Sequence, residues 1–372
     1  MQKPTLTARR IIELDLLRGF FIIVIILDHL QFWPSPFQYL TGQGRLWASA
    51  AEGFFIISGL LIGYLRAYKG THTPLKEISM KLWQRAGLLW LWAVIITIIV
   101  LGLSLTLPGT MALLPALPTP EQASSLPTLL LNIITLNYTS DWIYFLRLYA
   151  IMLAVTPLFL WLLRKRHTLT FIALSLGTYL ISLAFGIDET GMQWQILFFG
   201  AALIGWKLEI ILAWLRQHPR TRKAVIITLI SGTLASMALS YFMVHGWSYV
   251  ESPATSISRE TYISIRTNVD PIFSNEPLVL SRILLSFFWF GGLLALVHVI
   301  KKPLEHWLGW LLLTFGQASL TAYCLQAVVL VFVVKLVQLS GGFWVNTLAS
   351  SLVLLLIWGL MKLPLVQKIL PK

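Results

Sequence analysis

The chain has 372 residues, of which 57% are apolar and only 12% are charged, and its formal net charge is +13. Soluble domains carry about 25% charged residues, so this composition, with a mean hydropathy of +0.77, excludes a disordered chain, a disulfide scaffold and an ordinary cytosolic enzyme. The basic residues form no compact stripe or arm, so the positive charge does not indicate a nucleic-acid partner. What remains is a polytopic membrane protein.

A helix that crosses a bilayer needs about 20 mostly apolar residues. Ten stretches meet this requirement, namely 16–33, 46–67, 86–107, 142–163, 169–187, 193–214, 224–244, 278–300, 317–338 and 343–361. The apolar pieces 128–138 and 304–315 are too short, so we expect interfacial or re-entrant helices there. The sequence predicts an all-α integral membrane protein of about ten spans, forming one membrane-embedded domain over 1–372 with no separate soluble domain.

The distribution of Lys and Arg predicts the orientation of these spans, because cytoplasmic loops carry an excess of both residues. One set of span ends carries most of them, namely Lys3, Arg9, Arg10, Arg66, Lys69, Lys76, Lys81, Arg85, Arg164, Lys165, Arg166, Arg216, Arg220, Arg222, Lys223, Lys301, Lys302, Lys362, Lys368 and Lys372. The opposite loops offer only Arg45, Arg259 and Arg266, with Arg282 at the start of a span. We therefore expect a multi-pass cell-membrane protein with both termini in the cytoplasm.

The first span carries ionisable residues, which are costly in a bilayer and indicate a functional site by default. Arg18 and His29 are eleven positions apart, which places them within ~20° on one helix face and roughly 16 Å apart along it. Ile22 and Ile25 lie near the same stripe. The predicted orientation puts Arg18 near the cytoplasmic mouth, where snorkelling to lipid headgroups is the alternative interpretation. For His29, near the outer face, the alternative is an imidazole held by packing and one hydrogen bond.

Two carboxylates accompany His29. Asp28 precedes it and is expected to face another element, since adjacent helical residues point about 100° apart. Glu52 begins the second span at a similar depth, where a carboxylate could orient the imidazole and stabilise its protonated form. A carboxylate at the water interface is an equal alternative for Glu52. In the same span, Gly59 and Gly63 form a small-xxx-small face that predicts close approach of another helix.

Basic residues gather at the predicted cytoplasmic mouth, at Arg18, Arg66, Lys69, Lys81 and Arg85. The bias of cytoplasmic loops predicts several of them without any further function. Arg18 and Arg66 nevertheless project from span ends toward a common place that would suit phosphate groups.

Aromatic and charged residues open the fourth span on the outer side, including Trp142, Tyr144 and Arg147. Arg147 lies a turn or more inside, where an unpaired guanidinium would be expensive. It could pair with Asp141 or Glu52, or bind an anionic acyl group or a sugar, and pairing is the favoured interpretation.

Several catalytic motifs are missing from the sequence: a Walker-type loop, an HExxH pair, a cysteine cluster and a G-x-S-x-G elbow. Metal chemistry, nucleotide hydrolysis and α/β-hydrolase chemistry therefore have no support, and we expect no metal cofactor.

The run ELDLLRGF at 13–20, followed by LDH at 27–29, resembles the opening of the membrane acyltransferase type 3 superfamily, whose hallmark is an Arg, ten residues and a His in the first span. The FFIISG run at 54–59 is similar to the second motif of that superfamily, and Lys81 and Arg85 resemble the basic residues entering its third span. GQASLTAY at 316–323 resembles a later G-x-x-S segment. Many members have a second His three residues after the tyrosine that corresponds to Tyr323, and this chain has Gln326 at that position.

Within the superfamily, the chain looks closest to the branch that succinylates osmoregulated periplasmic glucans. The resemblance lies in the Asp28-His29 pair, in AAE at 50–52 and in YFLRLY at 144–149. It implies an acetyl or succinyl donor bound as acyl-CoA from the cytoplasm, and a glycan hydroxyl as acceptor on the other side.

The resemblance also implies roles for individual residues. Arg18, Arg66 and Arg85 would hold the phosphates of the donor, and the pantetheine arm would extend along the rise of about 16 Å between Arg18 and His29. His29 would act as general base, with a transient acyl-histidine as the alternative route. Asp28 and Glu52 would assist His29. The acyl group or acceptor would contact a further set of side chains, namely Ser58, Trp142, Tyr144 and Arg147.

Two other functions remain open. A heparan-glucosaminide-type N-acetyltransferase has a similar first span and acylates an amine. A transporter or flippase of about ten spans is the more distant possibility, but that class often shows inverted repeats and broken helices in matching halves, which are not evident here. The expected partners are the acyl donor, the acceptor and the lipid bilayer. Oligomeric state stays open.

Overall fold

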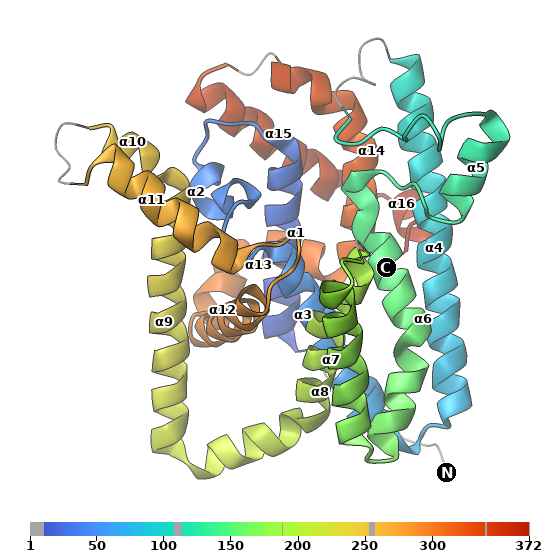
Figure 1. The fold of residues 1–372 in the computed structure, drawn as a ribbon, viewed down its shortest axis with the longest axis vertical. Coiled ribbons are helices and arrows are strands. Elements are labelled where there is room, and N and C mark those ends of the chain that lie inside the picture. Colours follow the sequence, from blue (N-terminus) through green and yellow to red (C-terminus); the bar gives the residue numbers. More distant parts are fainter. Residues whose placement is uncertain (1–10, 108–113, 188, 253–256, 339–340, 372) are drawn as a thin grey trace.

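The computed structural model describes residues 11–107, 114–187, 189–252, 257–338 and 341–371 (Figure 1). Its regular elements there are helical. The longer helices are α1 Ile12–Leu30, α3 Ala50–Ile62, α4 Leu75–Thr106, α6 Tyr144–Arg164, α7 Thr168–Ala184, α8 Thr190–Gln217, α9 Pro219–His245, α12 Leu280–Val299, α13 Lys301–Gln317, α14 Ser319–Gln338 and α15 Phe343–Lys362. The shorter ones are α2 Phe37–Thr41, α5 Leu126–Ile134, α10 Trp247–Val250, α11 Arg259–Val269 and α16 Pro364–Ile369, with single turns η1 Gly42–Gly44, η2 Gly63–Tyr68, η3 Lys69–His72, η5 Asp141–Ile143 and η6 Asp270–Phe273.

Among the described residues, seven helices are long and apolar enough to cross a membrane, or eight if the bent pair α13–α14 forms one span. The remaining two predicted spans correspond to α1 and α7. Helix α7 has 17 residues, which is short for a span. Helix α1 has 19 residues, and four of them are charged. The structure thus supports a polytopic membrane protein, while the full count of ten remains a prediction.

The two apolar pieces expected to be interfacial or re-entrant adopt short or bent structures. Piece 304–315 lies in α13, which meets α14 at an angle of 86°, as in a broken span or a re-entrant loop. Piece 128–138 contains α5, whose nine residues cannot cross a bilayer.

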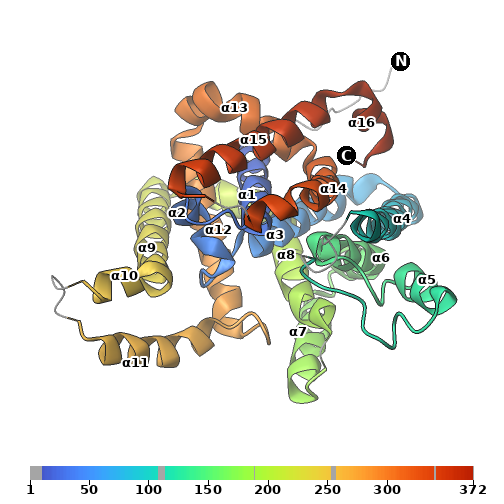
Figure 2. The ribbon, with the colours of Figure 1, turned by 90° about the horizontal axis from the view of Figure 1, so that it is seen from above.

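Helix α1 lies at the centre of the bundle (Figure 2), in contact with α3, α12, α13 and α14. Twelve of its 19 residues are buried. Its four charged residues are half-buried, so part of their surface lies against protein, as ionisable groups inside a membrane require. Helix α9 is peripheral by contrast, since only 11% of its most apolar window is buried.

Glycines allow the helices to approach closely at two crossings. A Cβ on Gly59 or on Gly63 would lie 1.9 Å from a backbone carbonyl oxygen of α8. The small-xxx-small prediction for this face is therefore confirmed. At the other crossing, a Cβ on Gly316 of α13 would lie 1.8 Å from the carbonyl oxygen of Asp15 on α1.

The second predicted span begins later than expected and ends in an irregular turn. Ser49 caps α3 through a capping box with Glu52, so residues 46–48 lie before the helix. At its other end, α3 continues into the π-helix η2, which carries Arg66. Figure 1 shows that the basic turns between α6 and α7 and between α8 and α9 lie at the same end of the molecule, with α5, α10 and α11 toward the opposite end. The membrane side of each end stays the prediction drawn from the Lys and Arg bias.

Candidate functional site

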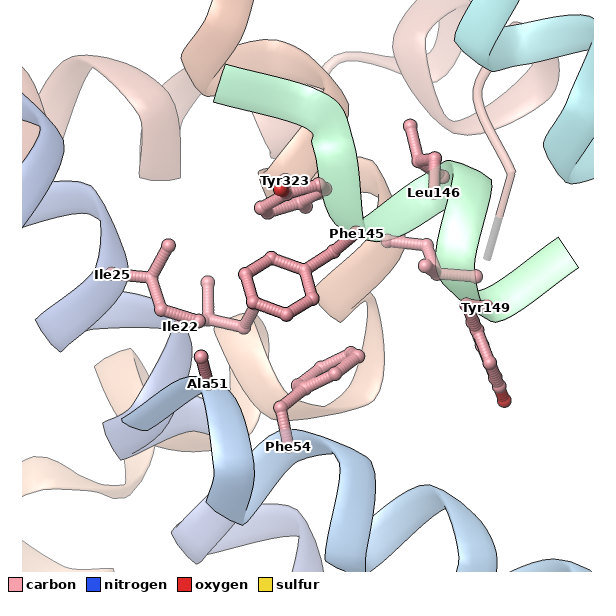
Figure 3. A pocket seen from close by; sticks show the side chains of 9 residues that line it. Ile22, Ile25, Ala51, Phe54, Phe145, Leu146, Tyr149 and Tyr323 are labelled. Carbon is pink, nitrogen blue, oxygen red and sulfur yellow. The ribbon is translucent and has the colours of Figure 1, made fainter. Parts of the chain in front are cut away.

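The polar stripe of α1 lies along a narrow cavity between four helices (Figure 3). Ile22 and Ile25 of α1 line it together with residues of three other helices, namely Ala51 and Phe54 of α3, Phe145, Leu146 and Tyr149 of α6, and Leu320 and Tyr323 of α14. Arg18 lies one turn before Ile22, and His29 lies one turn after Ile25, on the same helix face. The cavity therefore occupies the interval between the two residues that the sequence singled out.

Aromatic rings close this cavity. Figure 3 shows the side chains of Phe54, Phe145 and Tyr323 around it, and the rings of Phe145 and Tyr323 meet edge to face at 6.2 Å between centroids. The remaining space is about 10 Å³, room for about one water molecule. A ligand longer than a water molecule can pass only if these side chains move.

His29 is half-buried and lies beside Gln326 of α14, whose side-chain amide interacts with the imidazole. Gln326 is completely buried, and its Nε2 donates a hydrogen bond to the carbonyl oxygen of Trp142 at 3.2 Å. The Nδ1 atom of His29 is buried without a hydrogen-bond partner in the described part of the chain. The buried amide of Gln326 therefore lies beside the imidazole of His29.

Asp28 faces a different neighbour from His29, as expected from the helical geometry. Its carboxylate interacts with the hydroxyl of Thr41 and with the backbone N–H of Gly44, both in the segment that follows α1. A Cβ on Gly44 would lie 3.7 Å from the carboxyl carbon of Asp28. Asp28 therefore faces this segment from the C-terminal end of α1, and its Oδ1 atom has no hydrogen-bond partner among the described residues.

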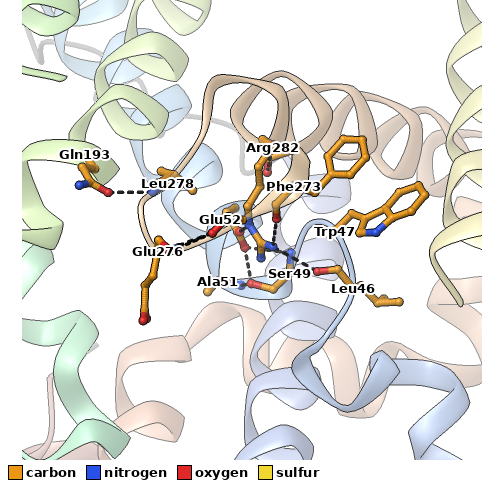
Figure 4. A network of polar contacts seen from close by, with 12 residues as sticks. Leu46, Trp47, Ser49, Ala51, Glu52, Gln193, Phe273, Glu276, Leu278 and Arg282 are labelled. Atoms are coloured by element: carbon orange, nitrogen blue, oxygen red, sulfur yellow. Dashed lines mark hydrogen bonds and ion pairs between the residues drawn. The ribbon is translucent and has the colours of Figure 1, made fainter. Parts of the chain in front are cut away.

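Glu52 lies in a buried polar cluster with Arg282 at the start of α12 (Figure 4). One carboxylate oxygen accepts a hydrogen bond from Arg282 Nε at 2.6 Å, and the other accepts from the Ser49 backbone N–H at 2.9 Å and from the Ser49 hydroxyl. Arg282 also donates to the carbonyl oxygens of Leu46 and Phe273 at 3.3 and 3.1 Å. The interpretation of Glu52 as a carboxylate at the water interface is therefore wrong.

The described residues show no contact between Glu52 and His29, and the expected role of Glu52 in orienting the imidazole stays a prediction. Sequence reasoning missed Arg282 as its partner. The signal was present, because Arg282 stands at the start of a span on the side where basic residues are scarce.

Arg147 forms an ion pair, as favoured, but neither of the two expected partners is the correct one. Its Nη2 lies 3.0 and 3.2 Å from the two carboxylate oxygens of Glu189, the residue before α8. The guanidinium also lies 5.7 Å from the ring centroid of Tyr144. Packing of α6 against α8 brings Glu189 to this place, whereas Asp141 and Glu52 lie elsewhere.

The Arg147–Glu189 pair borders a cavity of about 440 Å³ between α6, α7 and α8. This cavity is separate from the cavity along α1. Of the residues of α6, Arg147 and Leu148 line the cavity between α6, α7 and α8, whereas Phe145 and Leu146 line the cavity along α1. The structure therefore does not bring Arg147 into the cavity between Arg18 and His29.

The other candidate residues of the acceptor side are engaged locally. Trp142 is buried in η5, and its carbonyl oxygen holds Gln326. Ser58 is buried, and its hydroxyl donates to the carbonyl oxygen of Phe54 at 2.9 Å within α3. Just before η5, burial and the nearby carboxylate of Asp141 raise the pKa of Tyr138 to about 12, so this hydroxyl stays protonated at neutral pH.

The three arginines expected to hold phosphates come from three elements. Arg18 on α1 is half-buried, whereas Arg66 in η2 and Arg85 on α4 are exposed. Arg164, at the end of α6, is one of the many basic residues that the sequence assigns to the cytoplasmic side. Its guanidinium donates to the carbonyl oxygens of Arg66, Gly70 and Thr73 at 3.2, 2.6 and 2.7 Å. Arg164 thus holds the turn that presents Arg66.

The parts of the chain that the structure describes contain no group of three or more His, Cys, Asp or Glu residues placed to bind a metal ion.

The comparisons with known proteins give one match. A family described as OpgC protein matches residues 10–364, which is nearly the whole chain. No curated protein and no solved structure matches the chain. The family match confirms the resemblance to the glucan-succinylating branch at the level of the family. On this evidence the chain belongs to the OpgC protein family.

Proposed function

We propose that the protein is an integral membrane acyltransferase, which moves an acetyl or succinyl group from cytoplasmic acyl-CoA to a hydroxyl of an extracytoplasmic glycan. The observation that carries the proposal is the cavity along α1, which lies between Arg18 and His29 and is enclosed by four helices. Membership of the OpgC protein family supports acyl transfer as the reaction.

The donor is proposed to bind at the end of α1 that carries Arg18. Phosphate groups carry several negative charges and suit guanidinium groups, which donate hydrogen bonds in a planar fork. Arg18, Arg66 and Arg85 would supply these donors, with Arg164 holding the turn around Arg66. Held there, the donor would extend its pantetheine arm about 16 Å along α1 to bring the thioester to His29.

The chemistry proposed at His29 is general base catalysis. The unprotonated imidazole takes the proton of an acceptor hydroxyl while the oxygen attacks the thioester carbonyl. The new C–O bond forms, the C–S bond breaks, and the imidazolium returns the proton to the departing CoA thiolate. In the alternative route, a ring nitrogen of His29 attacks the thioester and CoA leaves as the thiol with the imidazole proton. The acceptor hydroxyl then takes the acyl group from the acyl-histidine and returns its proton to the imidazole.

The closed cavity adds a requirement to this proposal. Because only about 10 Å³ is free, the pantetheine arm can pass only after the rings of Phe54, Phe145 and Tyr323 have turned aside. Movements of side chains and loops that admit substrate are common in enzymes that exclude water from the reaction.

The test uses full-length protein purified in detergent, with radiolabelled succinyl-CoA or acetyl-CoA as donor and a glucan oligosaccharide as acceptor. His29→Ala should lower the transfer rate by about 10²- to 10⁴-fold, the contribution of a general base, while donor binding persists. The matched control is His306→Ala, because His306 is exposed on α13.

Unchanged transfer in His29→Ala would overturn the proposed chemistry. Transfer to glucosamine but not to the glucan would indicate the N-acetyltransferase instead. Donor binding without any transfer, together with uptake of the label into proteoliposomes, would indicate a transporter.

A further inference from the structure

Gln326 is a buried polar side chain in contact with the proposed catalytic base. It lies on α14, three positions after Tyr323, which lines the cavity of Figure 3. Its side chain is 0% exposed and interacts with the imidazole of His29. A buried amide needs partners for both its donor and its acceptor.

The amide orientation of Gln326 follows from its hydrogen bond to the backbone. A carbonyl oxygen can only accept, so the Gln326 atom that faces the carbonyl of Trp142 at 3.2 Å is the NH₂ group. The Oε1 atom must then point away from Trp142, and it is available as an acceptor.

Two buried polar atoms at this place have no hydrogen-bond partner within the described ranges. One is Oε1 of Gln326, and the other is Nδ1 of His29. The first is an acceptor and the second carries a proton in one of the two imidazole tautomers, so they match each other chemically. Helices α1 and α14 pack against each other and the two side chains interact, but no hydrogen bond joins these two atoms. Hydrogen bonds of catalytic groups are often loose in the free enzyme and tighten when substrate is bound.

We propose that Gln326 is the positioning residue of His29, an inference that rests on the proposed function. In the loaded enzyme, Oε1 of Gln326 accepts a hydrogen bond from Nδ1–H of His29. This bond selects the tautomer in which Nε2 is unprotonated and ready to take the proton of the acceptor hydroxyl. Trp142 fixes Gln326 in turn, so the base, the orienting amide and the backbone carbonyl form one chain across α1, α14 and η5.

An amide can orient the imidazole in place of a charged partner. The Gln326 amide does not titrate near neutral pH, so it orients the imidazole without adding a buried charge. The described part of the chain places Asp28 against Thr41 and Gly44, and Glu52 against Arg282 and Ser49, so neither carboxylate is positioned to do this.

The test compares three substitutions of Gln326 in the full-length protein, with succinyl-CoA as donor and a glucan oligosaccharide as acceptor. Gln326→Leu keeps a similar volume but has no acceptor, and kcat should fall about 10- to 100-fold, the usual effect of losing an orienting partner. The KM values for both substrates should stay within about twofold. Gln326→Asn is too short to reach both Trp142 and His29 and should behave like Gln326→Leu. Gln326→Glu retains an acceptor for His29 but loses the donor to the Trp142 carbonyl, so it should restore part of the activity.

The control for a purely structural role is the His29→Ala background. There, adding Gln326→Leu should cause no further loss of the residual rate, because the two residues act as a unit. A wild-type kcat in Gln326→Leu would overturn the inference, and so would a loss that appears only in a KM. If the wild-type protein transfers no acyl group, or if His29→Ala is fully active, the proposed function fails instead. Gln326→Glu guards against misfolding of the leucine variant, since a folded but inactive Gln326→Glu also contradicts the inference.

Discussion

The polar groups around His29, beyond one end of the apolar cavity along α1, and the cluster around Glu52 are two buried polar regions of the same bundle, and they differ in how completely their polar groups are paired. In the cluster, Glu52 and Arg282 have partners on several sides, including the carbonyl oxygens of Leu46 and Phe273. Along α1, by contrast, Nδ1 of His29 and Oε1 of Gln326 have no hydrogen-bond partner in the described residues.

The difference in hydrogen bonding separates buried polar groups that stabilise the fold from buried polar groups that are free to bind or react with a substrate. A fully satisfied network in a low dielectric rigidifies its surroundings. Buried groups without partners are rare and call for an explanation, and a site that waits for a substrate supplies one. On this reasoning the Glu52–Arg282 cluster fastens α12 to the start of α3, and the groups along α1 are those that we propose to carry the reaction.

The largest expected effect in this comparison is on stability, at the Glu52–Arg282 cluster. Removal of one partner leaves an uncompensated buried charge, so Arg282→Met and Glu52→Ala should each destabilise the protein by about 3–5 kcal/mol. The double variant Glu52→Leu with Arg282→Met should recover much of this loss, because no buried charge is then left unpaired. Thermal unfolding in detergent measures both effects.

The transfer activity per folded molecule distinguishes a structural role of Glu52 from a catalytic one. If Glu52→Ala lowers kcat per folded molecule while Arg282→Met does not, Glu52 has a direct role in catalysis and the division between the two regions fails. Equal melting temperatures for both single variants and the wild type would show that the cluster does not hold the fold.

A smaller effect is expected from opening the cavity along α1. Phe54→Ala removes one of the rings that close it, and the acyl group of the donor must pass these rings on its way to His29, so longer acyl groups should become better substrates. We expect the ratio of kcat/KM for butyryl-CoA to kcat/KM for acetyl-CoA to rise by about 10-fold, which is the typical effect of one methylene group in a hydrophobic pocket. Leu129→Ala on α5, outside the cavity lining, is the control. A ratio that stays constant would place the acyl path elsewhere.

The smallest effect is expected at Arg147. The pair with Glu189 is partly solvated, with side-chain exposures of 20% and 39%, so Arg147→Met should change stability by less than about 1 kcal/mol. Arg147 borders the cavity between α6, α7 and α8 and does not line the cavity along α1, so the rate of acyl transfer should also change little. A large rise in the KM for succinyl-CoA but not for acetyl-CoA would instead make Arg147 the residue that recognises the succinyl carboxylate.

Some of these features were predictable because they depend on one helix alone. The stripe of Arg18, Ile22, Ile25 and His29 follows from the period of the α-helix, and the structure places a cavity along its middle. Gly59 and Gly63 lie on one face by the same rule, and a neighbouring helix does approach there. The partners of Arg147 and Glu52 could not be predicted, since Glu189 and Arg282 are 42 and 230 residues away along the chain.

The sequence by itself determined that this protein is a helical membrane protein and that the first helix carries a polar stripe along one face. Hydropathy and helical periodicity are local properties, so they require no knowledge of the neighbours. Only the tertiary structure decided that Gln326 meets His29, that Arg282 neutralises Glu52 and that three aromatic rings close the cavity. These contacts depend on the rotation and depth of each helix against helices far away in the sequence, and packing of the whole bundle determines both.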